Sequence, residues 1–160
     1  MNRTSAYLWA AVIMLMVMFL PNSTTMNAVH SSWYKCIRPG ITPPSYVFPI
    51  VWTTLYVLIG IALAQTLLLP TSSSKSILLG LYAVNLTCNV LWSFAYFGSR
   101  DIGLAMAILL AIAISTACIL YYTSQLMPPW VLYLLVPYQA WILFAGVLNF
   151  LSLGKKCAKN

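Results

Sequence analysis

Long apolar stretches alternate with short polar breaks along the whole chain. Five such stretches occur, at about residues 5–20, 45–69, 76–97, 102–123 and 129–153. A helix needs about 17–25 apolar residues to cross the hydrocarbon core of a bilayer. The last four stretches meet this length, the first is at its lower limit, and none contains an Asp, Glu, Lys, Arg or His. The pattern predicts an all-α integral membrane protein, a bundle of five transmembrane helices forming a single domain over residues 1–160.

The first stretch has two interpretations. Arg3 precedes it and a polar segment follows it, as in a signal peptide. Its apolar part is longer than the roughly 7–15 residues usual in signal peptides, and no small-residue cleavage site follows. We therefore favour a retained helix.

The breaks between the later stretches are short turns. Residues 70–75 and 98–101 combine Pro or Gly with Ser and charged residues, and residues 124–129 end in two prolines. Asp101 is placed to cap the helix that follows it. Residues 21–44 form a longer break, rich in proline and aromatic residues, which we expect to be a stiff loop packed on the protein and a place for function.

Composition agrees with a membrane protein and gives an orientation. Only 6% of residues are charged, against about 25% in a soluble domain. The eight basic residues stand singly or in small groups between apolar stretches, which excludes a nucleic-acid interface and indicates orientation signals. In a five-helix topology, Arg3 and Lys75 share one side, and six basic residues share the other, which we therefore expect to be cytoplasmic, together with residues 21–44 and the C-terminus. These six are Lys35, Arg38, Arg100, Lys155, Lys156 and Lys159.

Reactive side chains are scarce. The four cysteines, Cys36, Cys88, Cys118 and Cys157, show no C-x-x-C spacing, so we interpret them as unlinked small hydrophobic residues and expect no metal site. The lone His30 is more consistent with polar surface than with a haem ligand. Without ionisable groups in the predicted spans, ion-coupled transport and hydrolytic chemistry are not expected.

Polar and aromatic residues recur at helical spacing in three of the stretches. Asparagines in lipid need hydrogen-bond partners, so the faces that carry them should point inward. Either they hold the helices together or they line a pocket, and the spacing does not choose. The residues are Pro49, Trp52 and Tyr56 in the second stretch, Asn85, Asn89, Trp92 and Tyr96 in the third, and Tyr138, Trp141, Ala145 and Asn149 in the fifth.

An aromatic pocket with a few amide groups suits a flat hydrophobic ligand. Ala145 would leave room beside the bulky residues, and Pro137 removes a backbone hydrogen bond and favours a kink in the fifth helix. Periodicity leaves tetrapyrrole binding, sterol binding and plain packing open. A stripe of small residues in the fourth stretch is interpreted as structural; it consists of Gly103, Ala107, Ala111 and Ser115.

Three motifs resemble those of one family. Residues 43–56, PPSYVFPIVWTTLY, resemble the second-helix signature of the translocator proteins, also called tryptophan-rich sensory proteins (TspO/MBR, or peripheral-type benzodiazepine receptors). Residues 89–92, NVLW, and 137–145, PYQAWILFA, resemble its third-helix and fifth-helix motifs. The resemblance covers about residues 33–150 in order.

This resemblance implies a five-helix bundle, often a homodimer, that binds porphyrins such as protoporphyrin IX, haem-related tetrapyrroles and, in animals, cholesterol. It implies a ligand but no required cofactor, and a mitochondrial outer membrane in eukaryotes or a plasma membrane in bacteria. Binding, transport and stress regulation are favoured over catalysis. The alternatives are light-dependent porphyrin degradation with Trp52 and Trp141 as catalytic residues, and sterol or lipid transport. The pocket residues that carry over by position are Trp52, Asn89, Trp92, Tyr138, Trp141 and Ala145.

Two positions depart from the family pattern. Ile41 stands where the family usually has a loop tryptophan, so closure over the ligand is expected to differ. Phe150 stands where the animal cholesterol motif has a tyrosine, and such motifs are weak even when intact. Lys35 and Arg38, near the expected mouth of the pocket, could bind porphyrin propionates.

Overall fold

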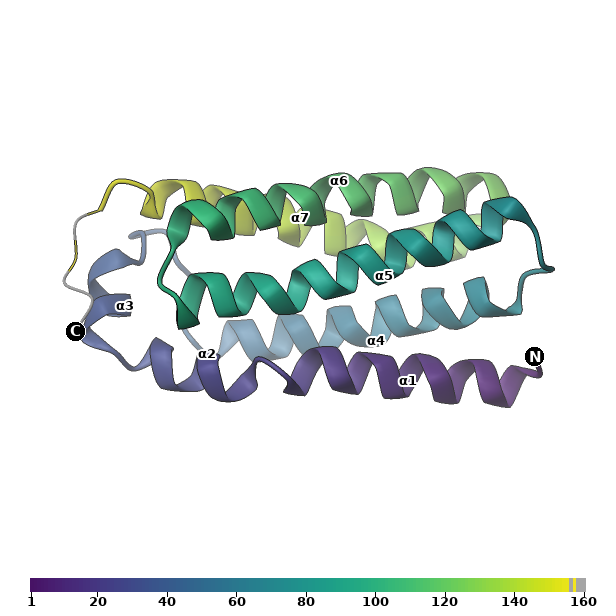
Figure 1. Ribbon diagram of the computed structural model, residues 1–160, viewed down its shortest axis with the longest axis horizontal. Helices are drawn as coiled ribbons and strands as arrows, with labels where there is room; N and C mark the ends of the chain where they lie inside the picture. The colour runs from purple at the N-terminus through teal and green to yellow at the C-terminus, as the bar shows by residue number, and fades with distance from the viewer. Residues whose placement is uncertain (156, 158–160) are drawn as a thin grey trace.

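The computed structural model, which describes residues 1–155 and 157, is an elongated bundle of five long helices (Figure 1). Three short helical segments cover one end of it. The long helices are α1 (Arg3–Phe19), α4 (Val47–Leu68), α5 (Ser73–Ser93), α6 (Ile102–Leu126) and α7 (Pro129–Ser152). The short ones are α2 (Asn22–Val29), α3 (Ser32–Ile37) and the π-helix η1 (Phe94–Gly98), which continues α5. The predicted all-α, five-helix architecture is therefore confirmed.

Side-chain caps explain where several helices begin. The amide oxygen of Asn2 accepts a hydrogen bond from the backbone N–H of Ser5 at 2.8 Å, and Ser72 Oγ accepts one from Lys75 at 3.2 Å. Asp101 Oδ1 accepts from Leu104 N–H at 2.9 Å, which confirms the predicted cap of α6. Each cap satisfies a donor that the first helical turn leaves without a backbone partner.

The five long helices are apolar all round, as membrane helices are. Within the described residues, each is long and apolar enough to span a bilayer, with α1 and α2 together forming the first span, Arg3–Val29. Large apolar side chains stay exposed on the outer faces, including Trp9 (61%), Ile114 (65%) and Phe150 (63%). Lipid is the solvent that such a surface requires.

The first helix packs closely against α4. Its small residues Ala6 and Ala10 are buried, and so is Met14. A Cβ atom at Gly60 of α4 would lie 3.1 Å from Met14 Cγ, so glycine allows α1 and α4 to approach closely.

The prediction that residues 21–44 form a loop is wrong for much of the segment. Helices α2 and α3 occupy part of it. Ser31 caps α3 by accepting from Tyr34 N–H at 3.1 Å, and the buried side chains of Trp33, Tyr34 and Ile37 form a cluster with Tyr96. The prolines in the segment favoured the prediction of a loop, but α3 is a short amphipathic helix that tertiary packing stabilises.

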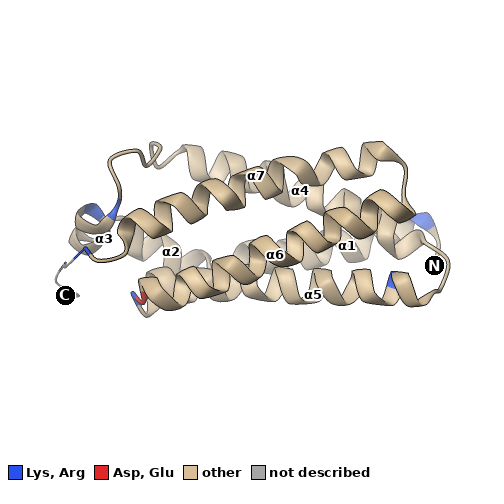
Figure 2. Cartoon of the chain, turned by 90° about the horizontal axis from the view of Figure 1, so that it is seen from above, with Lys and Arg blue, Asp and Glu red and all other residues tan. Residues whose placement is uncertain are grey.

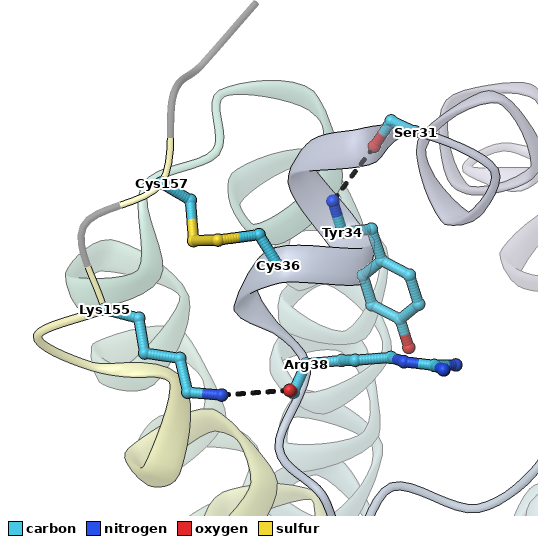
Figure 3. The surroundings of a disulfide bond; sticks show 6 residues. All are labelled: Ser31, Tyr34, Cys36, Arg38, Lys155 and Cys157. Atoms are coloured by element: carbon cyan, nitrogen blue, oxygen red, sulfur yellow. Dashed lines mark hydrogen bonds between the residues drawn. A yellow bond between two sulfur atoms is a disulfide. The ribbon is translucent and has the colours of Figure 1, made fainter.

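The prediction that all four cysteines are unlinked is also wrong. Cys36 of α3 and Cys157 beyond α7 form a disulfide, with 6.2 Å between their Cα atoms (Figure 3). The pair is separated by 121 residues, so spacing in the sequence carried no sign of it. Cys88 and Cys118 are free, as predicted.

Basic residues gather at the two ends of the bundle (Figure 2). Arg3 and Lys75 begin α1 and α5 at one end. Lys35, Arg38, Arg100 and Lys155 belong to the α3 end, whereas the predicted Lys156 and Lys159 lie outside the described residues. Which end faces the cytoplasm stays a prediction.

Candidate binding site in the helix bundle

The centre of the bundle holds a chain of phenol and amide groups that links three helices. The hydroxyl of Tyr56 donates to Asn89 Oδ1 at 2.9 Å. The Asn89 amide donates to the Tyr138 hydroxyl at 3.2 Å, which donates to Asn85 Oδ1 at 2.9 Å. All four side chains are buried. In a dry interior every polar group needs such a partner, so the inward orientation predicted for these residues is confirmed.

Asn85 extends this chain to α6. Its amide nitrogen lies within hydrogen-bonding distance of Ile112 O (3.1 Å), Ser115 Oγ (2.8 Å) and Thr116 Oγ1 (2.9 Å). Ser115 belongs to the small-residue stripe and contacts α5 through this hydrogen bond. Two members of that stripe, Gly103 and Ala107, are exposed instead.

Trp52 and Trp141 lie at the α4–α7 contact, beside this polar chain. The Trp52 ring stacks on Tyr56 at 5.3 Å and meets Tyr138 edge-on at 6.4 Å. Trp141 packs against Phe48 of α4, with 5.8 Å between ring centroids. Both indoles are only partly buried, so each presents aromatic surface towards the outside of the bundle while its other side contacts the core.

Trp92 belongs to a second aromatic group, closer to α3. It stacks on Tyr96 at 5.1 Å, and its indole N–H donates to Asn149 Oδ1 at 3.2 Å. The Asn149 amide in turn donates to Ile102 O at 3.1 Å, and the Tyr96 hydroxyl lies 3.1 Å from Ser152 Oγ. The structure thus places Trp92 in a group that adjoins the one formed by Trp52, Asn89, Tyr138 and Trp141.

The short helix α3 covers this second group. Trp33 meets Tyr96 at 6.1 Å, and Tyr34 meets Phe97 at 5.7 Å. The guanidinium of Arg100 lies over the Trp33 ring at 5.4 Å, a cation–π contact. Arg100 adopts a positive φ of 54° in the turn before α6, a conformation that costs energy for a side chain of this size. Burial raises the pKa of the Tyr34 hydroxyl, and the nearby Arg38 partly opposes this.

The remaining predicted residues take simpler positions. Ala145 is partly buried against the main core. His30 is exposed at the end of α2, and the described residues contain no cluster of His, Cys, Asp and Glu suited to a metal ion. Pro137 does not end α7, which runs continuously past it. Ile41 is 57% exposed.

Lys35 on α3 and Arg38, which directly follows α3, are both exposed. Their charges therefore lie at the α3 end of the bundle, where Figure 3 shows Arg38. The backbone carbonyl of Arg38 accepts a hydrogen bond from Lys155 Nζ at 2.9 Å.

Two hollows lie away from these residues. One, of about 610 Å³, lies between α2 and η1 and includes Thr24, Asn27 and Arg100 in its lining. The other, of about 340 Å³, is an apolar groove between α6 and α7, ending at Phe150 and Leu151. None of the six predicted pocket residues lines either hollow. At the centre, the aromatic side chains pack on one another, so a ligand has to displace some of these contacts to enter.

Sequence reasoning missed several members of the site. Phe48, Phe97 and Ser152 contact predicted residues, and the α3 side chains form the cover. Phe48 lies four residues before Trp52, so helical spacing was an available signal for it. Nothing in the spacing indicated Ser152 or the packing of α3.

The site offers aromatic faces at the α4–α7 contact, amide and phenol groups behind them, and cations at the α3 end. No Asp, Glu, Lys, Arg or His lies in the described α4, α5 or α7 beyond Lys75 at the start of α5.

Comparison with known proteins gives one consistent answer. The family model described as the TspO/MBR family matches residues 7–152. A protein named CrtK from Rhodobacter capsulatus is 32% identical over 124 residues, covering 74% of this chain and 75% of its own length. A tryptophan-rich protein TspO from Archaeoglobus fulgidus is 37% identical over 126 residues, covering 74% and 76% of the two chains.

Animal proteins are similar to the same extent. The translocator protein of Bos taurus is 35% identical over 121 residues, covering 74% of this chain and 71% of its own length. With a family model spanning nearly the whole bundle and relatives from bacteria, archaea and animals, the chain belongs to the TspO/MBR family.

Proposed function

We propose that this chain is a membrane receptor for porphyrins, with protoporphyrin IX and haem-related tetrapyrroles as its ligand class. The observation that carries the proposal is the pair of partly buried indoles, Trp52 and Trp141, at the α4–α7 contact. Behind them lies the buried amide and phenol chain through Asn89 and Tyr138. Flat aromatic faces backed by a few polar groups suit a large planar ring.

Binding would replace contacts that the protein now makes with itself. The porphyrin would enter at the α4–α7 contact and stack on Trp52 and Trp141, displacing the Phe48–Trp141 contact. The Asn89 amide would exchange one of its protein hydrogen bonds for a polar edge of the ring. The exposed cations of Lys35 and Arg38 would pair with the propionates where the ring reaches the α3 end. The protein needs no cofactor for this role.

Titration of protoporphyrin IX in the dark tests the proposal. The protein is held in nanodiscs and its tryptophan fluorescence is followed. We expect saturable quenching with a Kd of the order of micromolar, about −8 kcal/mol. The double variant Trp52→Phe, Trp141→Phe should bind about tenfold more weakly, because two indole faces at about 0.5–1.5 kcal/mol each sum to about 1–3 kcal/mol, and about 1.4 kcal/mol corresponds to a factor of ten.

A matched variant controls for tryptophan content. Trp9 and Trp130 are 61% and 48% exposed on outer faces, so the double variant Trp9→Phe, Trp130→Phe removes the same number of indoles without touching the site. Quenching that never saturates would refute the site. Equal loss of affinity in the Trp52, Trp141 double variant and in the Trp9, Trp130 double variant would refute it as well.

One contact favours a second function at the same site, light-dependent porphyrin degradation. Trp52 stacks on Tyr56, and the Tyr56 hydroxyl is hydrogen-bonded into the buried chain, so an indole oxidised by an excited porphyrin has a phenol beside it. Trp52 and Trp141 would then be catalytic residues. Loss of the porphyrin absorption bands under light, abolished by Trp141→Phe but not by Trp130→Phe, would establish this activity.

The apolar groove between α6 and α7 favours sterol or lipid binding as a third function. A sterol that binds there at micromolar concentration, without porphyrin binding at the indoles, would favour transport of sterols or lipids instead. The homodimer expected from the family also stays a proposal, and measurement of the protein mass in nanodiscs decides it.

A further inference from the structure

The disulfide joins two parts of the chain that lie on either side of the second aromatic group. Cys36 is on α3, whose Trp33 and Tyr34 cover Tyr96 and Phe97. Cys157 follows α7, whose Asn149 holds the Trp92 indole. The bond therefore links α3 covalently to the segment that follows α7 (Figure 3).

Non-covalent contacts hold the same two parts together when the bond is absent. Lys155 Nζ donates to Arg38 O at 2.9 Å, and Cys157 packs against the cluster that contains Trp33 and Ile37. Both thiols would thus stay near one another after reduction. Cys36 is exposed, which gives a small thiol reagent access to one member of the pair.

The charge distribution and the disulfide point to different environments. Lys35, Arg38, Arg100 and Lys155 share this end of the bundle, and basic residues favour the cytoplasmic side of a membrane. In the cytosol the glutathione pool keeps most thiols reduced, and the disulfides that do form there are usually transient or redox-sensing. A cysteine pair that alternates between dithiol and disulfide agrees with both the basic charge of this end and the presence of the disulfide.

We propose that Cys36 and Cys157 are a reversible thiol–disulfide site that locks α3 over the bundle when oxidised. Glutathione disulfide is the oxidant. The thiolate of one cysteine attacks it, giving a mixed disulfide and releasing one glutathione thiolate. The thiolate of the second cysteine then attacks the protein sulfur of that mixed disulfide and releases the second glutathione. Two protein thiols are oxidised, one glutathione disulfide is reduced to two glutathione molecules, and the two thiol protons pass to them through solvent.

The lock acts on the α3 end of the bundle, which a porphyrin would reach with its propionates after it enters at the α4–α7 contact. Without the bond, α3 is held by the packing of three buried side chains, by the Arg100–Trp33 contact and by the Lys155–Arg38 hydrogen bond. A six-residue helix has little stability of its own, so loss of the covalent link raises the frequency at which it opens. An effect of the lock on porphyrin entry rests on the function proposed above, whereas the thiol–disulfide chemistry of the cysteine pair does not.

Glutathione titration of the full-length protein in nanodiscs tests the chemistry. After equilibration at a series of reduced-to-oxidised glutathione ratios, the protein is acid-quenched, unfolded in detergent and alkylated. The mass then counts free thiols. We expect two alkyl groups in the oxidised form and four in the reduced form, with the midpoint inside the cytosolic range of ratios. Cys36→Ser should give three in every buffer, and the control Cys118→Ala should keep the transition with one group fewer.

Hydrogen exchange over residues 33–38 tests the lock. Reduction should speed exchange of these amides about tenfold or more, and Cys36→Ser should exchange fast in both buffers while Cys118→Ala behaves as wild type. If the cysteine pair stays oxidised at every cytosolic ratio of reduced to oxidised glutathione, the disulfide is a permanent structural bond. If the pair never oxidises, it is not a redox site. Either result overturns the proposal. Exchange unaffected by reduction overturns the lock.

Porphyrin kinetics separate this proposal from the proposed function. If protoporphyrin IX binds, its association should be slower to the oxidised protein than to the reduced one, and equal rates overturn the control of entry. If the porphyrin does not bind at all while the thiol counts and exchange rates respond as expected, the proposed function fails and the redox site stands.

Discussion

Replacing Tyr138 with phenylalanine removes one hydroxyl from the centre of the bundle. That hydroxyl donates to Asn85 Oδ1 at 2.9 Å and accepts from the Asn89 amide at 3.2 Å. The ring itself is 2% exposed, and phenylalanine keeps its shape. The change therefore leaves packing intact and takes away two hydrogen bonds.

The size of the effect follows from the partners left behind. Side-chain hydrogen bonds between membrane helices contribute about 0.6 kcal/mol on average and at most about 1.7 kcal/mol. The two partners also become buried groups with fewer bonds, which costs more than the bonds alone. We expect Tyr138→Phe to lower the free energy of unfolding by about 2 kcal/mol.

Tyr82 supplies a matched control on α5. It is also buried, at 3% exposure, and its hydroxyl lies near Thr66 without reaching good hydrogen-bond geometry with any described residue. Tyr82→Phe deletes the same atom without breaking a bond, and it relieves the cost of burying a hydroxyl. We expect it to be neutral or stabilising by up to about 1 kcal/mol.

The assay is equilibrium unfolding in mixed micelles as the fraction of dodecyl sulfate rises, followed by circular dichroism. Wild type, Tyr138→Phe and Tyr82→Phe are compared under identical conditions. If the two variants differ by less than about 0.5 kcal/mol, the reasoning that the phenol and amide chain stabilises the bundle is refuted, because burial and geometry are otherwise the same.

Two further changes test other parts of the fold by the same assay, and a third is tested by hydrogen exchange. Asp101→Ala should cost about 1 kcal/mol by removing the α6 cap, whereas Asp101→Asn should cost much less; equal losses would contradict the cap. Gly60→Leu should cost about 1–3 kcal/mol because its Cβ would press on Met14, while Gly80→Leu, with open space around it, should be tolerated; the reverse order would contradict the α1–α4 packing. Trp33→Ala should expose the α3 amides to exchange in both redox states, and protection equal to wild type would contradict the role of this ring in holding α3.

The long helices could be predicted from the sequence because lipid imposes a simple rule. A span must be apolar and about 20 residues long. The last four stretches satisfy this rule without ambiguity, whereas the first is at the lower limit and forms a full span only together with α2. The inward face of α5 could also be predicted from the sequence, because Asn85 and Asn89 cannot face lipid without hydrogen-bond partners. Hydrogen bonds to Tyr56 and Tyr138 now satisfy those amides.

The α3 end could not be predicted in the same way. Helix α3 is only six residues long, and its stability comes from contacts with Tyr96 and Phe97, which are remote in sequence. The Cys36–Cys157 bond depends on where the chain after α7 returns, and spacing says nothing of that. Helical spacing also left open whether the inward aromatic residues line a pocket or simply pack together. In the structure these side chains pack on one another.

Fluorine NMR of the protein labelled with 5-fluorotryptophan tests the central claim most directly, because it reports on all six indoles at once. Each resonance is assigned from single Trp→Phe variants, and protoporphyrin IX is added in the dark. A porphyrin shifts nuclei close above or below its plane through its ring current. The account predicts saturable shifts for Trp52 and Trp141 and none for Trp9 and Trp130. Shifts confined to Trp9 and Trp130, on the outer faces, would place the porphyrin in the lipid and contradict the account.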